Sequence, residues 1–282
     1  AIAILYLPTF VFWSSGILKD PICTGALGWI TYSLYSLFYK KSNPVKNIFI
    51  IVLFSYFLIV LKVYILVAYL PFFILFLLLK NVNLIKNKAV KTLLVLGFFT
   101  GSILGFVEIT NSIQKALSKY ASEGISKGIK NYQVNYQNQA EFVESNFSLG
   151  VEFDGSVGSL VKMAPAAVIA TLFRPYLWES KKLSTLLSSL ESLALMLFTI
   201  YVILKTGLIR FFKPVIKSPI VMYCFFYSLI FALFVGATTL NFGTLVRYKI
   251  PGIPFYLIAL FFILDFNKKI KKGPENIQAI AV

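Results

Sequence analysis

The sequence predicts an all-α protein, a polytopic transmembrane helical bundle of about six spans with re-entrant or interfacial segments and one extracytoplasmic loop of about fifty residues. Three observations predict this class. The chain is 58% hydrophobic and 13% charged, whereas an ordinary soluble domain is about a quarter charged. Its apolar residues form blocks close to the roughly 20 residues that cross a bilayer. Its lysines gather in short runs between those blocks, as the positive-inside rule describes.

The basic composition suggests membrane lipid as a partner and argues against nucleic acid. The formal net charge is +16, but a nucleic-acid surface needs its basic side chains clustered on one polar face. Here they lie between apolar blocks. The chain has no histidine, and its two cysteines lie in apolar stretches without metal-ligand spacing. We therefore expect no metal site and no cofactor in this single membrane domain, residues 1–282.

The N-terminal part of the chain predicts a broken helix followed by three spans. Residues 8–16 resemble a broken helix whose end reaches the outer surface. A first span covers 22–39, and the basic turn 40–46 follows it. The apolar block 48–79 is interrupted only by Lys62 and is long for one helix. We predict two short, tilted helices that meet near Lys62; the alternative is one long helix with a snorkelling lysine.

A polar loop follows the next predicted span, 92–107. This loop, 109–160, is mildly acidic and is predicted to lie outside the cytoplasm. Residues 112–130 have apolar side chains at helical spacing, which favours an amphipathic helix on the membrane surface. The apolar segment 160–173 is short for a span and contains Pro165, so we interpret it as re-entrant or interfacial.

The remaining spans are predicted near 183–204, 220–236 and 250–264. A basic link, 205–217, joins the first two, and a basic tail, 266–282, ends the chain. The last span is expected to open at a pair of prolines.

One threading places all the basic segments on the same side of the membrane. Together they hold fifteen Lys and Arg residues and one acid, Glu275; the segments are 40–46, 80–91, 205–217 and the tail. Because the basic side is the cytoplasmic side, we predict a multi-pass protein of the bacterial inner membrane with a cytoplasmic C-terminus. The chain begins at Ala1 without methionine, so we interpret it as an internal or C-terminal piece of a longer protein.

The same threading leaves charged residues on the outer face, against the general bias. They come from four distant segments and are Lys19, Asp20, Lys62, Arg174, Glu179, Arg247 and Lys249. Arginine offers a planar fork to phosphate oxygens, and lysine offers a point charge. We hypothesise that these cations bind a lipid phosphate or pyrophosphate that enters sideways from the bilayer. The alternative is that they anchor to lipid headgroups or pair with Asp20 and Glu179.

The two outer carboxylates are candidate catalytic groups. Asp20 lies beside Lys19 at the end of a broken helix, and Glu179 lies near Arg174. Either could act as a base towards a sugar hydroxyl. Glu191, inside a predicted span, is a further candidate because ionisable residues within membranes often have a function; the alternative is an interfacial position, since it lies about two turns from the start of the helix.

Four segments carry a resemblance that covers nearly the whole chain. They are residues 8–20, 61–64 (LKVY), 173–179 (FRPYLWE) followed by Leu190-Glu191, and 243–251 (GTLVRYKIP). This ordered set resembles polytopic proteins of bacterial surface-polysaccharide loci, especially GT-C-like glycosyltransferases common in Bacteroidetes. Val63 stands where such proteins are expected to have proline.

The resemblance implies an enzyme that uses a polyprenyl-phosphate-linked sugar or glycan at the outer face. In GT-C enzymes the catalytic acid usually lies in the first outer loop, which would precede Ala1 if this chain is a C-terminal portion. We predict transfer or polymerisation of sugar from such a donor. The alternatives are a transporter or flippase for a lipid-linked solute, and a non-catalytic subunit with envelope protein partners.

Overall fold

The computed structural model describes residues 7–16, 18–81, 146–151, 157–180 and 183–272, together with residues 89, 90, 93 and 97. Most of the predicted span 92–107, the amphipathic helix 112–130, most of the predicted loop and the end of the tail lie outside the described residues. The described regular structure is helical, which confirms the all-α class. Its elements are α2 (Pro8–Ser14), α3 (Lys19–Tyr35), a π-helical turn (Ser36–Lys40), α4 (Pro44–Asn81), α7 (Val157–Phe173), a 3₁₀ turn (Leu177–Glu179), α8 (Leu183–Thr206), α9 (Leu208–Lys217), α10 (Pro219–Thr238), α11 (Phe242–Tyr248) and α12 (Ile253–Lys272).

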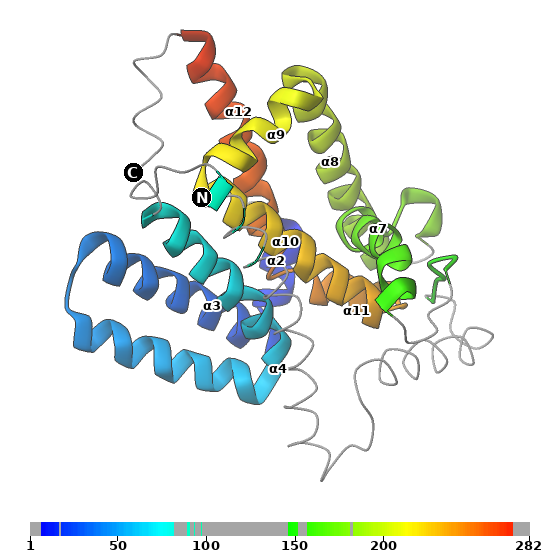
Figure 1. Cartoon of the computed structure of the whole chain (residues 1–282). Helices are drawn as coiled ribbons and strands as arrows, with labels where there is room; N and C mark the ends of the chain where they lie inside the picture. Colours follow the sequence, from blue (N-terminus) through cyan, green and yellow to red (C-terminus); the bar gives the residue numbers. More distant parts are fainter. Residues whose placement is uncertain are drawn as a thin grey trace.

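α3 and α4 form an antiparallel hairpin at one side of the molecule (Figure 1). The turn between them uses two residues with positive φ, Lys41 at 49° and Asn43 at 31°. Pro44 then opens α4, where its missing N–H leaves no hydrogen bond unmade. The Asn47 amide nitrogen donates to the Ser42 carbonyl at 2.5 Å, which closes the turn.

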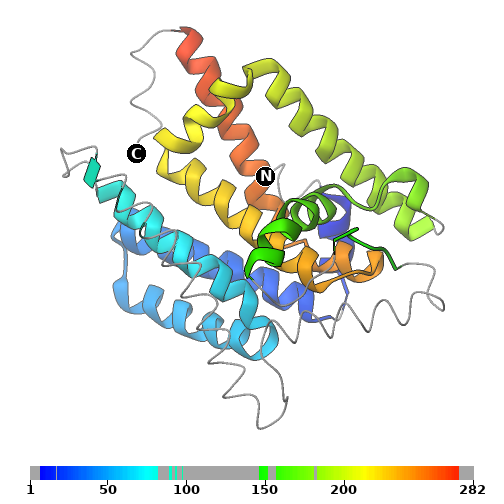
Figure 2. The ribbon, with the colours of Figure 1, turned by 45° about the vertical axis from the view of Figure 1, so that its right-hand side comes forward.

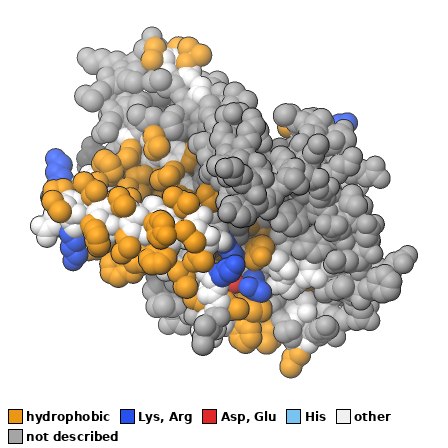
Figure 3. Space-filling view, turned by 90° about the horizontal axis from the view of Figure 1, so that it is seen from below, with side chains coloured by type: hydrophobic (Ala, Val, Ile, Leu, Met, Phe, Trp, Pro, Cys, Tyr) orange, Lys and Arg blue, Asp and Glu red, His pale blue; other side chains and the backbone are white. Residues whose placement is uncertain are grey.

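α4 is broken at Lys62, as the sequence predicts. The backbone there has φ −153° and ψ 72°, which is not helical, and the two halves run in different directions (Figures 1 and 2). The first half, Pro44–Val63, has 20 residues and is therefore about 30 Å long, the thickness of a bilayer's hydrocarbon core. On the face that carries this half, hydrophobic side chains cover the surface, and Lys or Arg side chains lie at both ends (Figure 3).

α10 is the central helix of the described structure and packs against α4, α7, α9 and α12 (Figure 2). Tyr227 and Phe231 on it are fully buried. The ring of Tyr227 meets that of Phe255 edge-on at 4.7 Å. The opposite face of α10 approaches α7 so closely that a Cβ on Gly236 would lie 2.2 Å from the Ala167 carbonyl oxygen. α10 therefore holds both sides of the helical bundle together.

Three helices among the described residues are long and apolar enough to cross a membrane: Pro44–Val63, Thr185–Thr206 and Pro219–Thr238. The bent pair α11 and α12, with an angle of 61° between them, makes a fourth if it counts as one broken span. The last two of the three agree within two residues with predicted spans. The predicted total of about six is not reached in the described part of the chain, where α3 has 17 residues and α7 is a shorter apolar helix. The composition of these helices is that of a multi-pass membrane protein.

Candidate functional site

Asp20 is the centre of a buried ionic group that three distant segments form. It lies in the first turn of α3, where the positive end of the helix dipole favours a carboxylate, and is 4% exposed. Its Oδ1 accepts a hydrogen bond from Lys62 Nζ at 2.5 Å. Its Oδ2 accepts from Arg247 Nη2 at 2.9 Å and from Nε at 3.2 Å. The structure therefore brings together three of the predicted site residues, from α3, α4 and α11.

Aromatic rings hold the two cations in place. The Lys62 ammonium lies 3.9 Å from the centre of the Tyr248 ring, and the Arg247 guanidinium lies 5.2 Å from that of Trp13. Both distances fall within the range of cation–π attraction. The break in α4 is what allows this arrangement, because it places Lys62 opposite the N-terminus of α3.

The Asp20 group carries an excess positive charge. Burial raises the pKa of the Asp20 carboxyl, but the hydrogen bonds and charges of Lys62 and Arg247 outweigh burial and bring the pKa below its ordinary value of 3.8. The carboxylate is therefore ionised at neutral pH, and two cations around one anion leave a net charge of about +1. The Arg247 side chain is 32% exposed, so this charge can be reached from outside. Lys19, next in sequence, is exposed as well.

A second ionic group contains Arg174 and Glu179. Arg174 Nε donates to both Glu179 carboxylate oxygens, at 3.0 and 3.1 Å, and Nη2 donates to Oε1. The Tyr176 N–H donates to Glu179 at 2.9 Å. The guanidinium also lies over the Phe147 ring, at 4.3 Å. The sequence analysis gives pairing with Asp20 and Glu179 as the alternative to phosphate binding. The structure shows such a pairing for Arg174, Lys62 and Arg247.

Lys249 connects this second group to α8. It is 3% exposed, and its Nζ donates to the Arg174 carbonyl at 3.0 Å and to Ser192 Oγ at 2.8 Å. Its ammonium is therefore enclosed by protein oxygens, whereas Arg247 faces outward. The phosphate-binding roles of Lys19, Lys62, Arg174, Arg247 and Lys249 stay predictions.

The catalytic roles of Asp20 and Glu179 also stay predictions. The Asp20 pKa is lowered, and a carboxylate of low pKa is a weak general base. The Glu179 oxygens accept three hydrogen bonds from Arg174 and one from the Tyr176 N–H. Asp20 accepts three hydrogen bonds, from Lys62 and Arg247, of the about four that a carboxylate can take.

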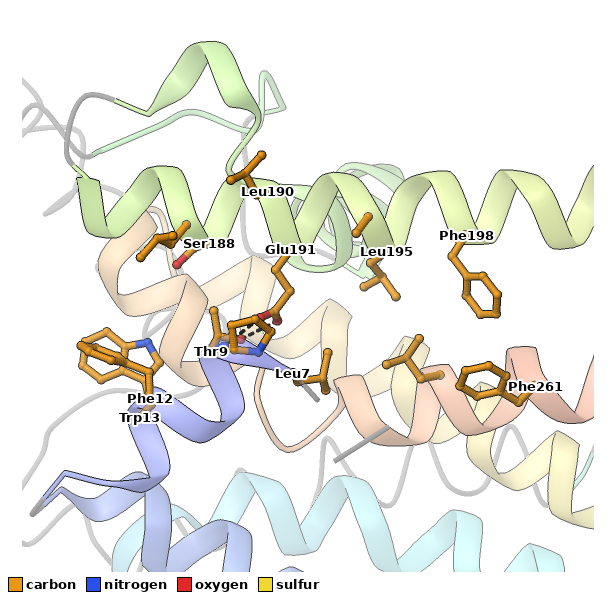
Figure 4. Close-up of a pocket in the computed structure, with 14 residues that line it drawn as sticks. Leu7, Thr9, Phe12, Trp13, Ser188, Leu190, Glu191, Leu195, Phe198 and Phe261 are labelled. Carbon is orange, nitrogen blue, oxygen red and sulfur yellow. Dashed lines mark hydrogen bonds between the residues drawn. The ribbon is translucent and has the colours of Figure 1, made fainter. Parts of the chain in front are cut away.

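Next to the Asp20 group, a cavity of about 760 Å³ lies among α2, α8 and α12 (Figure 4). Glu191 faces into it and joins α8 to α2. Its Oε2 accepts from the Thr9 N–H at 2.7 Å, and its Oε1 accepts from Thr9 Oγ1 at 2.5 Å. The intramembrane acid that the sequence singled out is thus a lining residue of this cavity.

The cavity has a more polar end and a wholly apolar end. Trp13 and Ser188 lie at the first, and Phe198 and Phe261 lie at the second (Figure 4). Along α8 the lining runs from Leu187 to Phe198, which is about 16 Å at 1.5 Å per residue. That length is close to half of a hydrocarbon core about 30 Å thick. The length of the cavity along α8 is therefore similar to the thickness of the hydrocarbon of one leaflet.

Trp13 connects the cavity to the Asp20 group, because the same ring lines the cavity and contacts the Arg247 guanidinium. A molecule with its hydrocarbon chain in the cavity and its anionic head at Arg247 would meet matching chemistry along its length. Sequence reasoning found the cations but missed the cavity. Thr9 and Glu191 are 182 residues apart, and no local pattern indicates their contact.

The fold and the site together define a helical protein with helices long and apolar enough to span a membrane, and with a largely apolar cavity beside a cationic centre. No family model, curated protein or solved structure matches the chain.

Proposed function

We propose that the chain is an integral inner-membrane protein of bacterial cell-surface glycan assembly. It transfers or polymerises sugar from a polyprenyl-phosphate-linked donor at the outer face. The observation that carries this proposal is the position of Arg247 between Asp20 and Trp13. In this position the Arg247 guanidinium can contact a phosphate outside the protein, while Asp20 and Trp13 hold it in place.

The charge of the Asp20 group supports binding of a phosphate head. Lys62 and Arg247 exceed Asp20 by one positive charge, and Arg247 Nη1 points to no acid among the described residues. Phosphate oxygens accept charge-assisted hydrogen bonds that are roughly twice as strong as neutral ones. Near an apolar wall these contacts are screened less than in water.

The cavity supports binding of a lipid chain from the side. Several of its lining residues are also exposed large hydrophobic residues, namely Phe12, Leu187, Leu190 and Phe261. A rim of this kind is stable in hydrocarbon and allows a chain to enter from the bilayer. A cavity whose length along α8 is similar to the hydrocarbon of one leaflet also favours a ligand held at one face over a solute carried across the membrane, which requires a pathway through both leaflets.

The experiment is a binding assay with a polyprenyl monophosphate, using the purified chain in phosphatidylcholine nanodiscs. Arg247→Gln should weaken binding about 10- to 100-fold, the loss of one charge-assisted hydrogen bond to phosphate. Arg247→Lys keeps the positive charge but not the planar guanidinium. Its affinity should lie between those of the wild type and Arg247→Gln. Lys46→Gln is the matched control, because it removes one charge from the far end of the first half of α4.

Wild-type binding by Arg247→Gln and by Lys62→Gln would overturn the proposal. The activity itself is tested in cells that lack the chromosomal copy. Arg174→Ala and Arg247→Ala should each abolish the glycan product at an unchanged protein level. Normal product from both variants would remove the enzyme hypothesis.

A further inference from the structure

α9 is a short helix that lies at the end of two membrane-spanning helices. It follows α8 after Gly207, and α10 begins two residues after it ends. Gly207 has φ 75° and ψ 152°, a conformation that only glycine adopts readily, and it turns the chain out of the direction of α8. Since α8 and α10 are both candidate spans, the helix between them lies at a membrane boundary. Figure 1 shows α9 at the end of α8, beside α12.

The side chains of α9 divide into three faces. At 100° per residue these faces cover arcs of about 100°, 100° and 60° that do not overlap. The first packs into the protein and holds Phe211, Pro214 and Val215. The second is exposed and apolar and holds Leu208, Ile209, Phe212 and Ile216. The third is exposed and basic and holds Arg210, Lys213 and Lys217.

The apolar face of α9 is so exposed that contact with water would be unfavourable. Ile209 is 87% exposed and Ile216 is 70% exposed, so the transfer of both side chains from water to lipid is favourable. The basic face cannot enter hydrocarbon. Protein, hydrocarbon and charged headgroups meet at one place only, which is the interface of the bilayer beside the transmembrane bundle.

Among the ion pairs of the described residues, none joins an acid to Arg210, Lys213 or Lys217. The sequence contains no Asp or Glu from Ser192 to Leu264. α12 packs against α9, and its Asn267 amide donates to the Arg210 carbonyl at 3.2 Å. Asp265 and the exposed Lys268 lie on that last part of α12, and Lys205 lies just before α9. Of these six charged residues, five are cations and one, Asp265, is an acid.

We infer that α9 is an interfacial helix whose basic face binds the anionic phospholipid headgroups of the leaflet that it touches. Its apolar face inserts among the acyl chains and sets the depth, so that the three cations lie at the level of the phosphates. This inference does not depend on the proposed function. Each cation near an anionic surface should favour anionic over neutral lipid by about fivefold.

The experiment measures which lipid surrounds α9. Phe212→Trp places a fluorophore on the apolar face, and the parent chain supplies the signal of its own three tryptophans for subtraction. Nanodiscs contain the same small fraction of brominated phosphatidylglycerol or of brominated phosphatidylcholine. The added fluorescence should be quenched several-fold more by the brominated phosphatidylglycerol. Adding Arg210→Gln, Lys213→Gln and Lys217→Gln should abolish the difference while quenching by phosphatidylcholine persists.

The matched control removes the same number of charges from the α3–α4 turn, with Lys40→Gln, Lys41→Gln and Lys46→Gln. This control should keep the preference for phosphatidylglycerol at α9. Equal quenching by the two lipids overturns the inference, and so does loss of the preference in the control, because the effect then belongs to the whole basic side. Weak quenching by both lipids also overturns it and indicates that another protein covers α9.

Discussion

Replacing Asp20 with asparagine tests the ionic group on which the proposed site depends. Asp20→Asn keeps the shape of the side chain but leaves Lys62 and Arg247 without their anion. Breaking a buried pair costs about 3–5 kcal/mol. Lys62 is 9% exposed and Arg247 is 32% exposed, so solvent screens part of the loss. We expect the free energy of unfolding to fall by about 2–3 kcal/mol.

Phosphate-type anions should reverse this loss. The variant raises the charge of the group from about +1 to about +2, so it should bind inorganic pyrophosphate more tightly than the wild type does. An anion at a concentration 100 times its Kd adds about 2.7 kcal/mol to the free energy of unfolding. This gain is close to the loss expected from Asp20→Asn. The measurement is thermal unfolding in detergent with and without pyrophosphate. Glu179→Gln, which releases Arg174 from the other group, serves as a comparison.

The pH dependence gives an independent check of the same group. The folded-state pKa of Asp20 lies below the ordinary value of 3.8, so its stabilisation is present above that value and is lost as the pH falls through the folded pKa. The difference in stability between wild type and Asp20→Asn should therefore be constant from about pH 8 to about pH 5. A difference that shrinks within this range, or equal stability of the two proteins, would refute the reasoning.

Three further predictions test the bundle, the cavity and the topology. Gly236→Ala should lower the free energy of unfolding by about 1–3 kcal/mol, because its Cβ meets the α7 backbone. Gly28→Ala, where a Cβ would meet nothing within 4 Å, should leave stability unchanged or raise it. Ala194→Trp should fill the cavity and weaken binding of a long-chain polyprenyl phosphate while leaving inorganic pyrophosphate binding unchanged; equal weakening of both would contradict the cavity's role. In intact cells an impermeant thiol reagent should label Ser148→Cys and not Lys213→Cys, and the reverse pattern would invert the predicted topology.

Part of the fold follows from local properties of the sequence. Apolar blocks of about the right length predict the spans of α8 and α10 within two residues. The lysine inside the 48–79 block predicts the break in α4, because one helix of that length exceeds the bilayer and a charge in hydrocarbon is costly. The sequence predicts only a basic link at 205–217, whereas the structure has the helix α9 there, turned out of α8 at Gly207. The division of α9 into three faces can be assigned only when the start of the helix is known, and Gly207 marks that start.

The sequence alone determined the all-α class, the positions of the candidate spans in α8 and α10 and the set of charges available for a site, because these depend on composition and on neighbours along the chain. The tertiary structure decided which charge meets which. It placed Lys62 and Arg247 on Asp20, put Lys249 behind Arg174, and brought Thr9 to Glu191 across 182 residues to form the cavity. These contacts depend on how the helices pack around α10, and helix packing is set by shapes and close approaches, such as that of Gly236 to α7, which hydrophobicity does not encode.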